Sequence, residues 1–504
     1  MRKLWAAAAT AAVAGAAVML PWWGPVRRRA IRSDNTPPAP LQFPQQFLWG
    51  VATAAHQVET RTPNDWTAFE ERALQQGLTQ RAPGSIHNLH TWPPEVLQRK
   101  TDHVARVHQD VALMASLGVK AYRFSVEWAR LFPTAAHTTP DPQGLAFYVE
   151  LVTALKAANI TPVVTLFHFT TPQWLWEEHQ GHRGLERDDA VEHFERFVSA
   201  VARALGAHVT LWCTLNEPMV YAYQGYLQGI FPPLEKRGDP KAVAPVIVQL
   251  ARMHAAAYAI LKKDAAARGI TNQVGLTQHT RHFVPARNLN PLDRATAMAV
   301  SQVFMWDFLD ALETGTLAFT TTGMKKHIEG LAGTQDYVGL NYYGRFYLRS
   351  DVLHPQQYTV LDHDDATDTR VNDLGWALDP AGFRATLRTA HQRYHKPIYV
   401  MEAGTADAQD DDRLRQWFLV THATEMWHAI QNDGVDVRGL FVWSLMDNFE
   451  WAEGFEGRFG LHKVDYRGNF KRTRRPSADL YESMARNGAV TPEMLARFPR
   501  HMDP

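Results

Sequence analysis

Residues 208–218 read HVTLWCTLNEP. An apolar, β-prone run ends there in an amide, a carboxylate and a proline. A carboxylate placed where a buried strand leaves the core is costly to desolvate, and such groups are often kept for chemistry. We therefore predict that Glu217 is a proton donor or acceptor at the carboxyl end of a strand.

A second stretch has the same form. Residues 396–401, KPIYVM, are again an apolar strand, and Glu402 follows directly. An isolated glutamate after a strand more often caps a helix or lies on the surface. Two of them, far apart in the sequence, are what a barrel of parallel strands brings face to face. A proton donor paired with a nucleophile in this way is the equipment for cleaving a glycosidic bond.

The rest of the chain alternates short β-prone runs with longer segments of helical apolar spacing. The predicted strands are residues 47–55, 121–128, 161–169, 209–215, 273–278, 337–343, 397–401 and 439–445. The predicted helices between them include 108–117, 144–158, 190–205, 243–267, 295–313 and 414–431. This alternation predicts an α/β fold, a (β/α)8 TIM barrel whose site is built by the loops after the strands. Two long loops, 80–94 and 351–373, are predicted to shape a cleft mouth or to be mobile.

The composition removes several classes of function. Lys+Arg and Asp+Glu are balanced at 52 each, so the chain has no general electrostatic attraction for nucleic acid. The single Cys213 excludes an internal disulfide and is predicted to be buried in a strand. The 23 histidines form no ligand-spaced cluster, and His87 and His90 are interpreted as a solvated loop pair. No metal or other cofactor is predicted.

The amino terminus differs from the rest of the chain. A basic start precedes an apolar run over residues 4–20, and three arginines follow at 27–29. This pattern fits a signal peptide, whose cleavage would release an exported protein. The stretch 4–26 is also long enough to span a bilayer, so we favour an uncleaved membrane anchor of undecided orientation. The predicted units are the anchor or signal segment (1–30), a linker (31–42), the glycosidase domain (43–485) and a tail (486–504).

Polar side chains collect where the predicted strands end. They are Gln57, Glu59, Arg123, His168, Asn216, Glu217, Asn341, Tyr343, Glu402 and several side chains of residues 443–454. In a barrel these amides, carboxylates and tryptophans share one rim. Polar groups pair with hydroxyls and indole faces stack on sugar rings, so the rim is predicted to bind a polyhydroxyl compound.

At this point the sequence resembles glycoside hydrolase family 1, the β-glucosidase and β-galactosidase family, from about residue 43 to residue 481. The motifs that carry the resemblance are FLWGVATA at 47–54, GVKAYRF at 118–124, EWARLFP at 127–133, TLNEP at 214–218, GLNYY at 339–343, the Glu402 segment, WSLMDNFEWAEG at 443–454, RFGL at 458–461 and VDY at 464–466. Any one of them could arise by chance, but all of them in this order could hardly do so.

The resemblance implies an O-glycosyl hydrolase that acts on terminal β-D-glucosides or β-D-galactosides by double displacement, with retention of configuration. Glu217 would be the acid/base and Glu402 the nucleophile. Arg123 and the Tyr343 hydroxyl would keep Glu402 ionised, with Asn341 as a further support. The neighbouring negative charge and partial burial would raise the pKa of Glu217.

The resemblance also implies which residues bind the sugar. Asn216 would hold the 2-hydroxyl, and Trp443 would be the stacking platform. The positions that match binding of the 3-, 4- and 6-hydroxyls are Gln57, His168, Glu450 and Trp451, and Tyr343 also belongs to the substrate site. Glu450 can accept a bond from either epimer, so glucose and galactose are not distinguished.

Four residues depart from the family pattern. Met401 and Ala403 flank Glu402 where the family usually has Thr-Glu-Asn-Gly, which removes polar groups that could orient the nucleophile. His56 replaces an aromatic residue before Gln57, and Phe169 replaces a tryptophan after His168. We interpret these changes as signs of an unusual aglycone, a shifted substrate preference or low turnover.

Two alternatives to hydrolysis follow from the same residues. A membrane-associated transglycosylase would pass the glycosyl group to a sugar hydroxyl, and its substrate would be a glycolipid in place of a small soluble β-glycoside. A catalytically weak sugar-binding protein would keep the fold without turnover. Both glutamates are present, as are Arg123 and Tyr343, which favours an enzyme.

Overall fold

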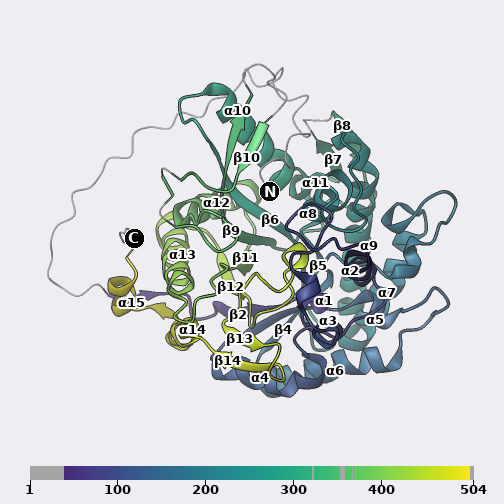
Figure 1. Cartoon of the computed structure of the whole chain (residues 1–504), viewed down its shortest axis with the longest axis horizontal. Coiled ribbons are helices and arrows are strands. Elements are labelled where there is room, and N and C mark those ends of the chain that lie inside the picture. The colour runs from purple at the N-terminus through teal and green to yellow at the C-terminus, as the bar shows by residue number, and fades with distance from the viewer. Residues whose placement is uncertain (1–38, 320–322, 352–357, 366, 369, 500–504) are drawn as a thin grey trace.

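The computed structural model describes residues 39–319, 323–351, 358–365, 367–368 and 370–499. Eight parallel strands close into a central barrel, because β6 pairs with both β5 and β9 (Figure 1). The barrel strands are β2 (Leu48–Ala52), β3 (Ala121–Ser125), β4 (Thr161–Phe167), β5 (Leu211–Asn216), β6 (Gln273–Pro285), β9 (Val338–Ser350), β11 (Ile398–Ala403) and β12 (Val437–Trp443). Each overlaps a predicted strand, so the predicted (β/α)8 barrel is confirmed.

Helices surround the barrel (Figure 1). The longer ones are α2 (Asp65–Gln75), α4 (Val107–Ser116), α6 (Pro142–Ala157), α7 (Ala190–Leu205), α9 (Ala244–Arg268), α10 (Pro291–Ser301), α11 (Asp307–Thr314), α12 (Pro380–Tyr394), α13 (Arg413–Asp433) and α14 (Pro476–Asn487). The shorter ones are α1 (Ala55–Val58), α3 (Pro94–Arg99), α5 (Trp128–Leu131), α8 (Pro218–Ala222) and α15 (Pro492–Arg497). Local chemistry sets many of their ends. Helix α12, for example, begins with Pro380 after Asp379, whose carboxylate accepts from the backbone N–H of Gly382, and α9 ends at Gly269 with φ 67°.

The predicted helix 295–313 is interrupted. Between α10 and α11 the chain makes one π turn, η7 (Gln302–Trp306). The wider turn brings the carbonyl oxygen of Phe304 within 2.5 Å of the Gln278 amide nitrogen, and the Phe304 ring lines the pocket at the top of the barrel. Such turns are frequent at functional sites. A π turn holds one residue more than a helical turn, and the apolar residues before and after it keep helical spacing. The sequence pattern therefore shows little sign of the interruption.

Strands β6 and β9 run well beyond their predicted ends at residues 278 and 343. Their projecting halves stay paired with each other, and β10 (Tyr358–Leu361) adds an antiparallel strand to β9. The predicted loop 351–373 therefore contains a strand, although residues 352–357, 366 and 369 lie outside the described residues. These strands extend one wall of the barrel past its rim.

The folded unit is wider than the predicted 43–485. Strand β1 (Leu41–Gln42) pairs with β15 (Ala489–Val490), and α15 follows, so the ends of the predicted linker and the start of the predicted tail belong to the domain. Two further hairpins, β7 (Thr316–Phe319) with β8 (Met324–His327) and β13 (His462–Asp465) with β14 (Lys471–Arg474), decorate the barrel. The predicted anchor lies outside the described residues.

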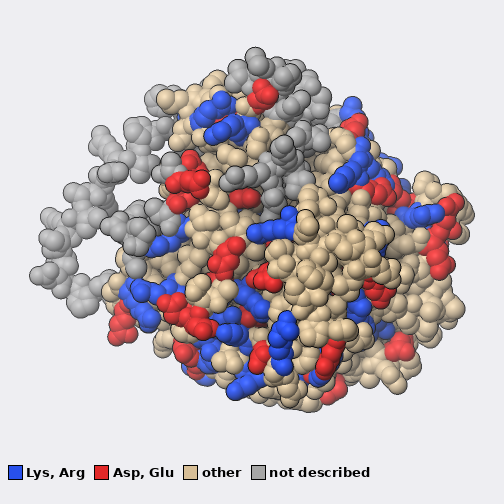
Figure 2. Space-filling view, viewed as in Figure 1, with Lys and Arg blue, Asp and Glu red and all other residues tan. Residues whose placement is uncertain are grey.

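One segment among the described residues, Pro240–Arg268, is long and apolar enough to cross a membrane. It contains α9, which packs on α7, and 61% of its apolar window is buried inside the protein, as expected of a core helix. On the face shown in Figure 2, basic and acidic side chains are interspersed. This distribution agrees with the formal net charge of zero.

Candidate active site

Glu402 lies on β11, one residue before the strand ends. The pairing of β11 with β9 shifts register between Val400 and Glu402, and the carboxylate is buried in the barrel mouth. Arg123 Nη1 donates to Oε1 at 2.5 Å, and the Tyr343 hydroxyl donates to Oε2 at 2.5 Å. Both contacts are those that the sequence predicts. These two contacts orient the carboxylate of Glu402, although the flanking residues Met401 and Ala403 have no polar side chain that could do so.

Glu217 follows β5 in a left-handed backbone conformation, with φ 47°. Its backbone N–H donates to the carbonyl oxygen of Thr277 at 2.7 Å. Asn341 Nδ2 donates to Oε1 at 2.7 Å, and His279 Nδ1 lies 2.9 Å from the same oxygen. A non-glycine residue in this conformation persists only where its surroundings fix it, and such residues cluster at active sites.

Arg123, Asn216 and Asn341 join the two carboxylates. Arg123 Nη2 donates to Asn216 Oδ1 at 2.7 Å, and Asn341 Nδ2 approaches the same oxygen at 3.2 Å. A continuous set of hydrogen bonds therefore runs from Glu402 to Glu217. Asn341 was predicted to support the nucleophile, but the carboxylate that it contacts is that of Glu217.

The pKa shifts of the two carboxyls differ from those predicted. Burial is the largest influence on Glu402 and, with the charge of Glu217 adding to it against Arg123, raises the pKa of Glu402 to about 7. Burial also opposes ionisation of Glu217, but His279, Asn341 and Arg123 together hold the pKa of Glu217 below its ordinary value. The directions of the two shifts are the reverse of those predicted, because sequence reasoning did not place the His279 imidazole against Glu217.

All of the sugar-binding residues predicted from the family except Gln57 line the same pocket. His168, Trp443, Glu450 and Trp451 line it together with Asn216 and Tyr343. The His168 ring lies nearly parallel to the indoles of Trp443 and Trp451, with centroids 6.1 and 5.9 Å away. Burial, reinforced by the charge of Arg123, lowers the pKa of His168 well below its usual range, so the ring is neutral.

Gln57 lies just behind these residues. Its Nε2 donates to the carbonyl oxygen of Phe449 at 2.7 Å and to Asn448 Oδ1 at 2.9 Å. Its Oε1 is buried and has no partner among the described residues. Gln57 is not among the residues that line the pocket, and its amide nitrogen holds residues 448–450 from behind.

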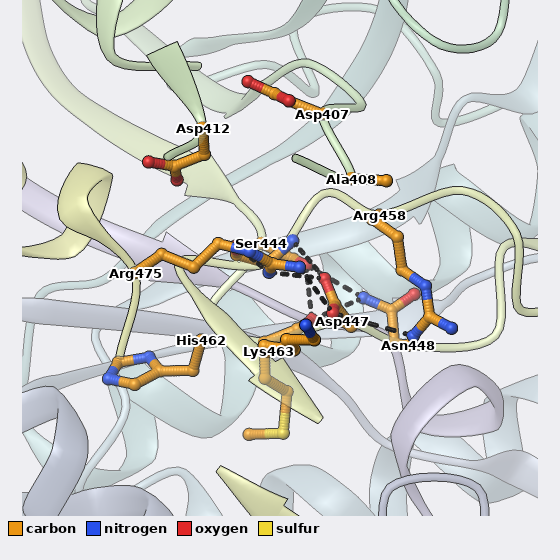
Figure 3. A network of polar contacts seen from close by, with 12 residues as sticks. Asp407, Ala408, Asp412, Ser444, Asp447, Asn448, Arg458, His462, Lys463 and Arg475 are labelled. Carbon is orange, nitrogen blue, oxygen red and sulfur yellow. Dashed lines mark hydrogen bonds and ion pairs between the residues drawn. The ribbon is translucent and has the colours of Figure 1, made fainter. Parts of the chain in front are cut away.

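The loop 443–454, which carries three of the sugar-binding residues, is fixed from behind by a buried ion pair (Figure 3). Arg475 donates to both oxygens of Asp447 at 2.8 and 3.0 Å, and the backbone N–H of Gly460 donates to the same carboxylate. Asn448 Nδ2 donates to Ser444 Oγ at 2.9 Å. A carboxylate with this many donors away from water has little freedom to move, so the loop is rigid.

His56 and Phe169 complete the aromatic wall. His56 stacks on Trp451, with an interplanar angle of 11°, and its Nε2 lies 2.9 Å from Glu70 Oε1. Phe169 packs against Trp451 and Phe231. Burial lowers the pKa of His56 to about 4, so this histidine serves as a neutral flat ring in the place of an aromatic residue.

The rest of the pocket lining was not predicted in residue detail. It consists of Arg81, Ala82, Pro83, Val220, Gln224, Gln228, Ile230, Phe231, His279, Arg281, Phe304, Phe346, Asp362, Leu374, Trp376, Ala452 and Glu453. The loops 80–94 and 351–373 contribute to it, as predicted for a cleft mouth. His279 and Arg281 directly follow the fifth predicted strand. The rule that polar residues gather at strand ends would have found them.

No group of three or more His, Cys, Asp or Glu residues suited to a metal ion occurs in the part of the chain that the structure describes. His90 lies in a short 3-10 turn, η1 (Leu89–Thr91). Cys213 is buried on β5, as predicted.

Comparison with known proteins places this site in a family. The sequence model described as "Glycosyl hydrolase family 1" matches residues 39–489. "Beta-glucosidase A" of Thermotoga maritima is 29% identical over 472 residues, which cover 89% of this chain and 99% of that protein. The solved structure of a β-glycosidase from Pyrococcus horikoshii is similar with a TM-score of 0.78 at 34% identity, over 91% of this chain and 98% of that one. A rice β-glucosidase mutant in a covalent complex with glucose is similar with a TM-score of 0.78 at 27% identity, over 88% and 98%.

Proposed function

This chain belongs to glycosyl hydrolase family 1 and is an O-glycosyl hydrolase, and we propose that it hydrolyses terminal β-D-glucosides or β-D-galactosides with retention of configuration. The observation that carries the proposal is the pair Glu217 and Glu402. Both are buried, both line one pocket, and Arg123, Asn216 and Asn341 connect them. Retaining glycosidases need two such carboxyl groups on one site.

In the first step a carboxylate oxygen of Glu402 attacks the anomeric carbon, and the bond to the leaving oxygen breaks. Glu217 gives its proton to that oxygen. In the second step Glu217 removes a proton from water, whose oxygen displaces Glu402 and restores both side chains. The pair must therefore hold one proton, which the pKa shifts favour on Glu402 before substrate binds and which must lie on Glu217 at the moment of attack. Arg123 and Tyr343, each 2.5 Å from Glu402, stabilise the ionised nucleophile in that arrangement.

The polar groups of the inner pocket suit a pyranose. Glu450 Oε2 lies 3.5 Å from Trp443 Nε1 and 3.4 Å from Gln57 Nε2, so one carboxyl sits beside a stacking surface and an amide. Burial raises the pKa of Glu450 to about 8. A carboxyl that is neutral near pH 7 can both donate to and accept from a sugar hydroxyl, which suits either epimer at C4.

A covalent trap tests the proposal. The full chain is incubated with 2-deoxy-2-fluoro glucosides and galactosides that carry a good leaving group, and intact mass is followed by peptide mapping. We expect an adduct on Glu402, and the relative trapping rates rank the two sugars. The Glu402→Gln variant, which keeps the shape without the nucleophile, is the matched control. Folded protein that forms no adduct with either sugar would refute turnover and favour the sugar-binding alternative.

A second candidate function is transfer of the glycosyl group to an alcohol acceptor. Ile230, Phe231 and Phe304 are among the apolar residues that line the pocket, which favours an acceptor with apolar surface over water. We also propose that residues 4–26 hold the protein at a membrane, where a glycolipid would be the acceptor and substrate. Product analysis with a glycolipid separates the cases, since free sugar indicates hydrolysis and an oligosaccharide-bearing lipid indicates transfer. Carbonate extraction of membranes tests the anchor.

A further inference from the structure

His279 connects Glu217 to a buried arginine. The imidazole Nδ1 lies 2.9 Å from Glu217 Oε1, and Arg281 Nε donates to the imidazole Nε2 at 3.2 Å. All three groups line the same pocket. His279 and Arg281 stand two residues apart on β6, so their side chains leave the strand on the same side.

Arg281 is fixed on its other sides. Its guanidinium lies over the rings of Trp376 and Phe346, at 4.3 and 4.5 Å from their centroids. The side chain is 2% exposed, and Asp362 is the acidic residue that faces it from the β10 side. In this position Arg281 Nε points towards His279.

This contact decides the tautomer of His279. Arginine has no acceptor, so a hydrogen bond between Arg281 Nε and His279 Nε2 requires a lone pair on Nε2. The imidazole proton must then lie on Nδ1, from which it is donated to Glu217 Oε1. The opposite tautomer and the imidazolium would each point an Nε2 proton at the Arg281 N–H.

Glu217 consequently has two different oxygens. Oε1 accepts from His279 Nδ1 and Asn341 Nδ2, whereas no protein group among the described residues binds Oε2. We propose that His279, held in one tautomer by Arg281, is a positioning residue that confines the transferable proton of Glu217 to Oε2. The inference rests on the proposed role of Glu217 as acid/base. It deepens that role, because an acid delivers its proton efficiently only from the oxygen that faces the leaving group.

The contact between His279 and Glu217 also sets the pH range over which Glu217 can act as an acid. Donors on Oε1 stabilise the ionised form of Glu217, so the loss of one of them raises the pKa of Glu217. In the catalytic arrangement, where Glu217 carries the proton of the pair, this moves the basic limb of the kcat/KM profile to higher pH. The other titratable or charged groups around the pair are Glu402 and Arg123 facing Glu217, Tyr343 stacked on the His279 ring, and Asp362, Tyr342 and Tyr343 facing Arg281. Replacing the imidazole by an apolar ring of similar size removes its contacts with Glu217 and Arg281.

Three variants test the proposal. His279→Phe keeps an aromatic ring and removes the donor. His279→Asn keeps a donor at the δ position, where Nδ2 can replace Nδ1. His282→Asn is the matched control, because His282 lies on the same strand and its Nδ1 also contacts a carboxylate, Asp379 at 2.7 Å, away from the pocket. Each is assayed with 2,4-dinitrophenyl and methyl β-glycosides of the preferred sugar, since only the methyl leaving group needs the acid.

For His279→Phe we expect kcat/KM to fall about 10- to 100-fold with the methyl glycoside and by less than about 3-fold with the dinitrophenyl glycoside, part of the 10²–10⁴ of general acid catalysis. The basic limb should move up by about 1 pH unit, which corresponds to the free energy lost with one hydrogen bond to a charged acceptor. His279→Asn should restore both quantities towards the wild type, and His282→Asn should leave them unchanged.

A fall of equal size with both substrates, or an unmoved basic limb, would overturn the proposal. Arg281→Met keeps His279 and frees its tautomer, so it should shift the limb in the same direction. An unshifted limb in that variant would refute the role of Arg281. Turnover of the dinitrophenyl glycoside by the wild type distinguishes these failures from a failure of the proposed function.

Discussion

Arg123→Met removes the positive charge that faces the nucleophile. Arg123 is 1% exposed and donates to Glu402, to Asn216 and, at 3.0 Å, to Thr165 Oγ1. Without it, Glu402 keeps only the Tyr343 hydroxyl. The loss of an adjacent opposite charge raises the pKa of a carboxyl by about 1–3 units. Since the pKa of Glu402 already lies at about 7, the variant should titrate at about 8–10.

The expected loss of activity follows from these values. At pH 7 the ionised fraction of Glu402 should drop from about one half to between about one tenth and one thousandth, so kcat/KM should fall roughly 5- to 500-fold. The assay is the pH profile with a dinitrophenyl glycoside, which needs no acid from Glu217. The acid limb should move up by about 1–3 pH units, and activity should partly return at high pH.

Arg123→Lys is the matched control. Its ammonium keeps the charge but cannot span Glu402 and Asn216 in the same geometry, so the limb should move less. Urea unfolding measures the accompanying loss of stability, which should be about 3–5 kcal/mol for one broken partner of a buried ion pair. If the acid limb of Arg123→Met stays in place while activity falls, Arg123 acts on position alone, and the electrostatic reasoning is refuted.

Two further predictions concern carboxyls outside the catalytic pair. Burial raises the pKa of Glu450 to about 8, so this carboxyl is neutral at pH 6. Glu450→Gln should therefore change KM by less than about 3-fold at pH 6, whereas Glu450→Ala should raise KM about 10-fold. An equal rise of KM in both variants would contradict a neutral Glu450. Although burial opposes it, Lys100 at 2.6 Å, with His56 and Arg61, lowers the pKa of Glu70 to about 2. Its folded pKa lies below the unfolded value, so its stabilisation, about 3 kcal/mol, is present above about pH 4.3 and is lost as the pH falls through about 2. In urea unfolding, Glu70→Gln should have a smaller free energy of unfolding than the wild type at pH 7. Its free energy of unfolding should also lack the fall that the wild type shows between about pH 4.3 and about pH 2. An unchanged dependence on pH would contradict the assignment.

The barrel and the two carboxylates could be predicted from the sequence. Alternation of apolar runs with helical spacing is a local property, and parallel strands joined by helices close into a barrel with their carboxyl ends on one side. A polar residue directly after an apolar run must therefore lie on that rim, which is how Glu217, Glu402 and His168 could be placed.

Other features required the tertiary structure. The lengths of β6 and β9 were underestimated because polar residues such as His279 and Arg281 break the apolar pattern, although pairing between the two strands satisfies their backbone groups beyond the rim. Similarly, β1 and β15 are too short to have a pattern of their own. They exist because the two ends of the domain meet.

The protonation of Glu217 and Glu402 also required the tertiary structure. Whether Glu217 or Glu402 holds the shared proton depends on which groups lie within a few ångströms of each carboxyl and on how much water each has lost. His279 is 62 residues from Glu217 in the sequence and 2.9 Å from it in space. Periodicity indicates which side of a strand a residue occupies, but only the assembled barrel sets the distance between side chains on neighbouring strands, and that distance decides the electrostatics.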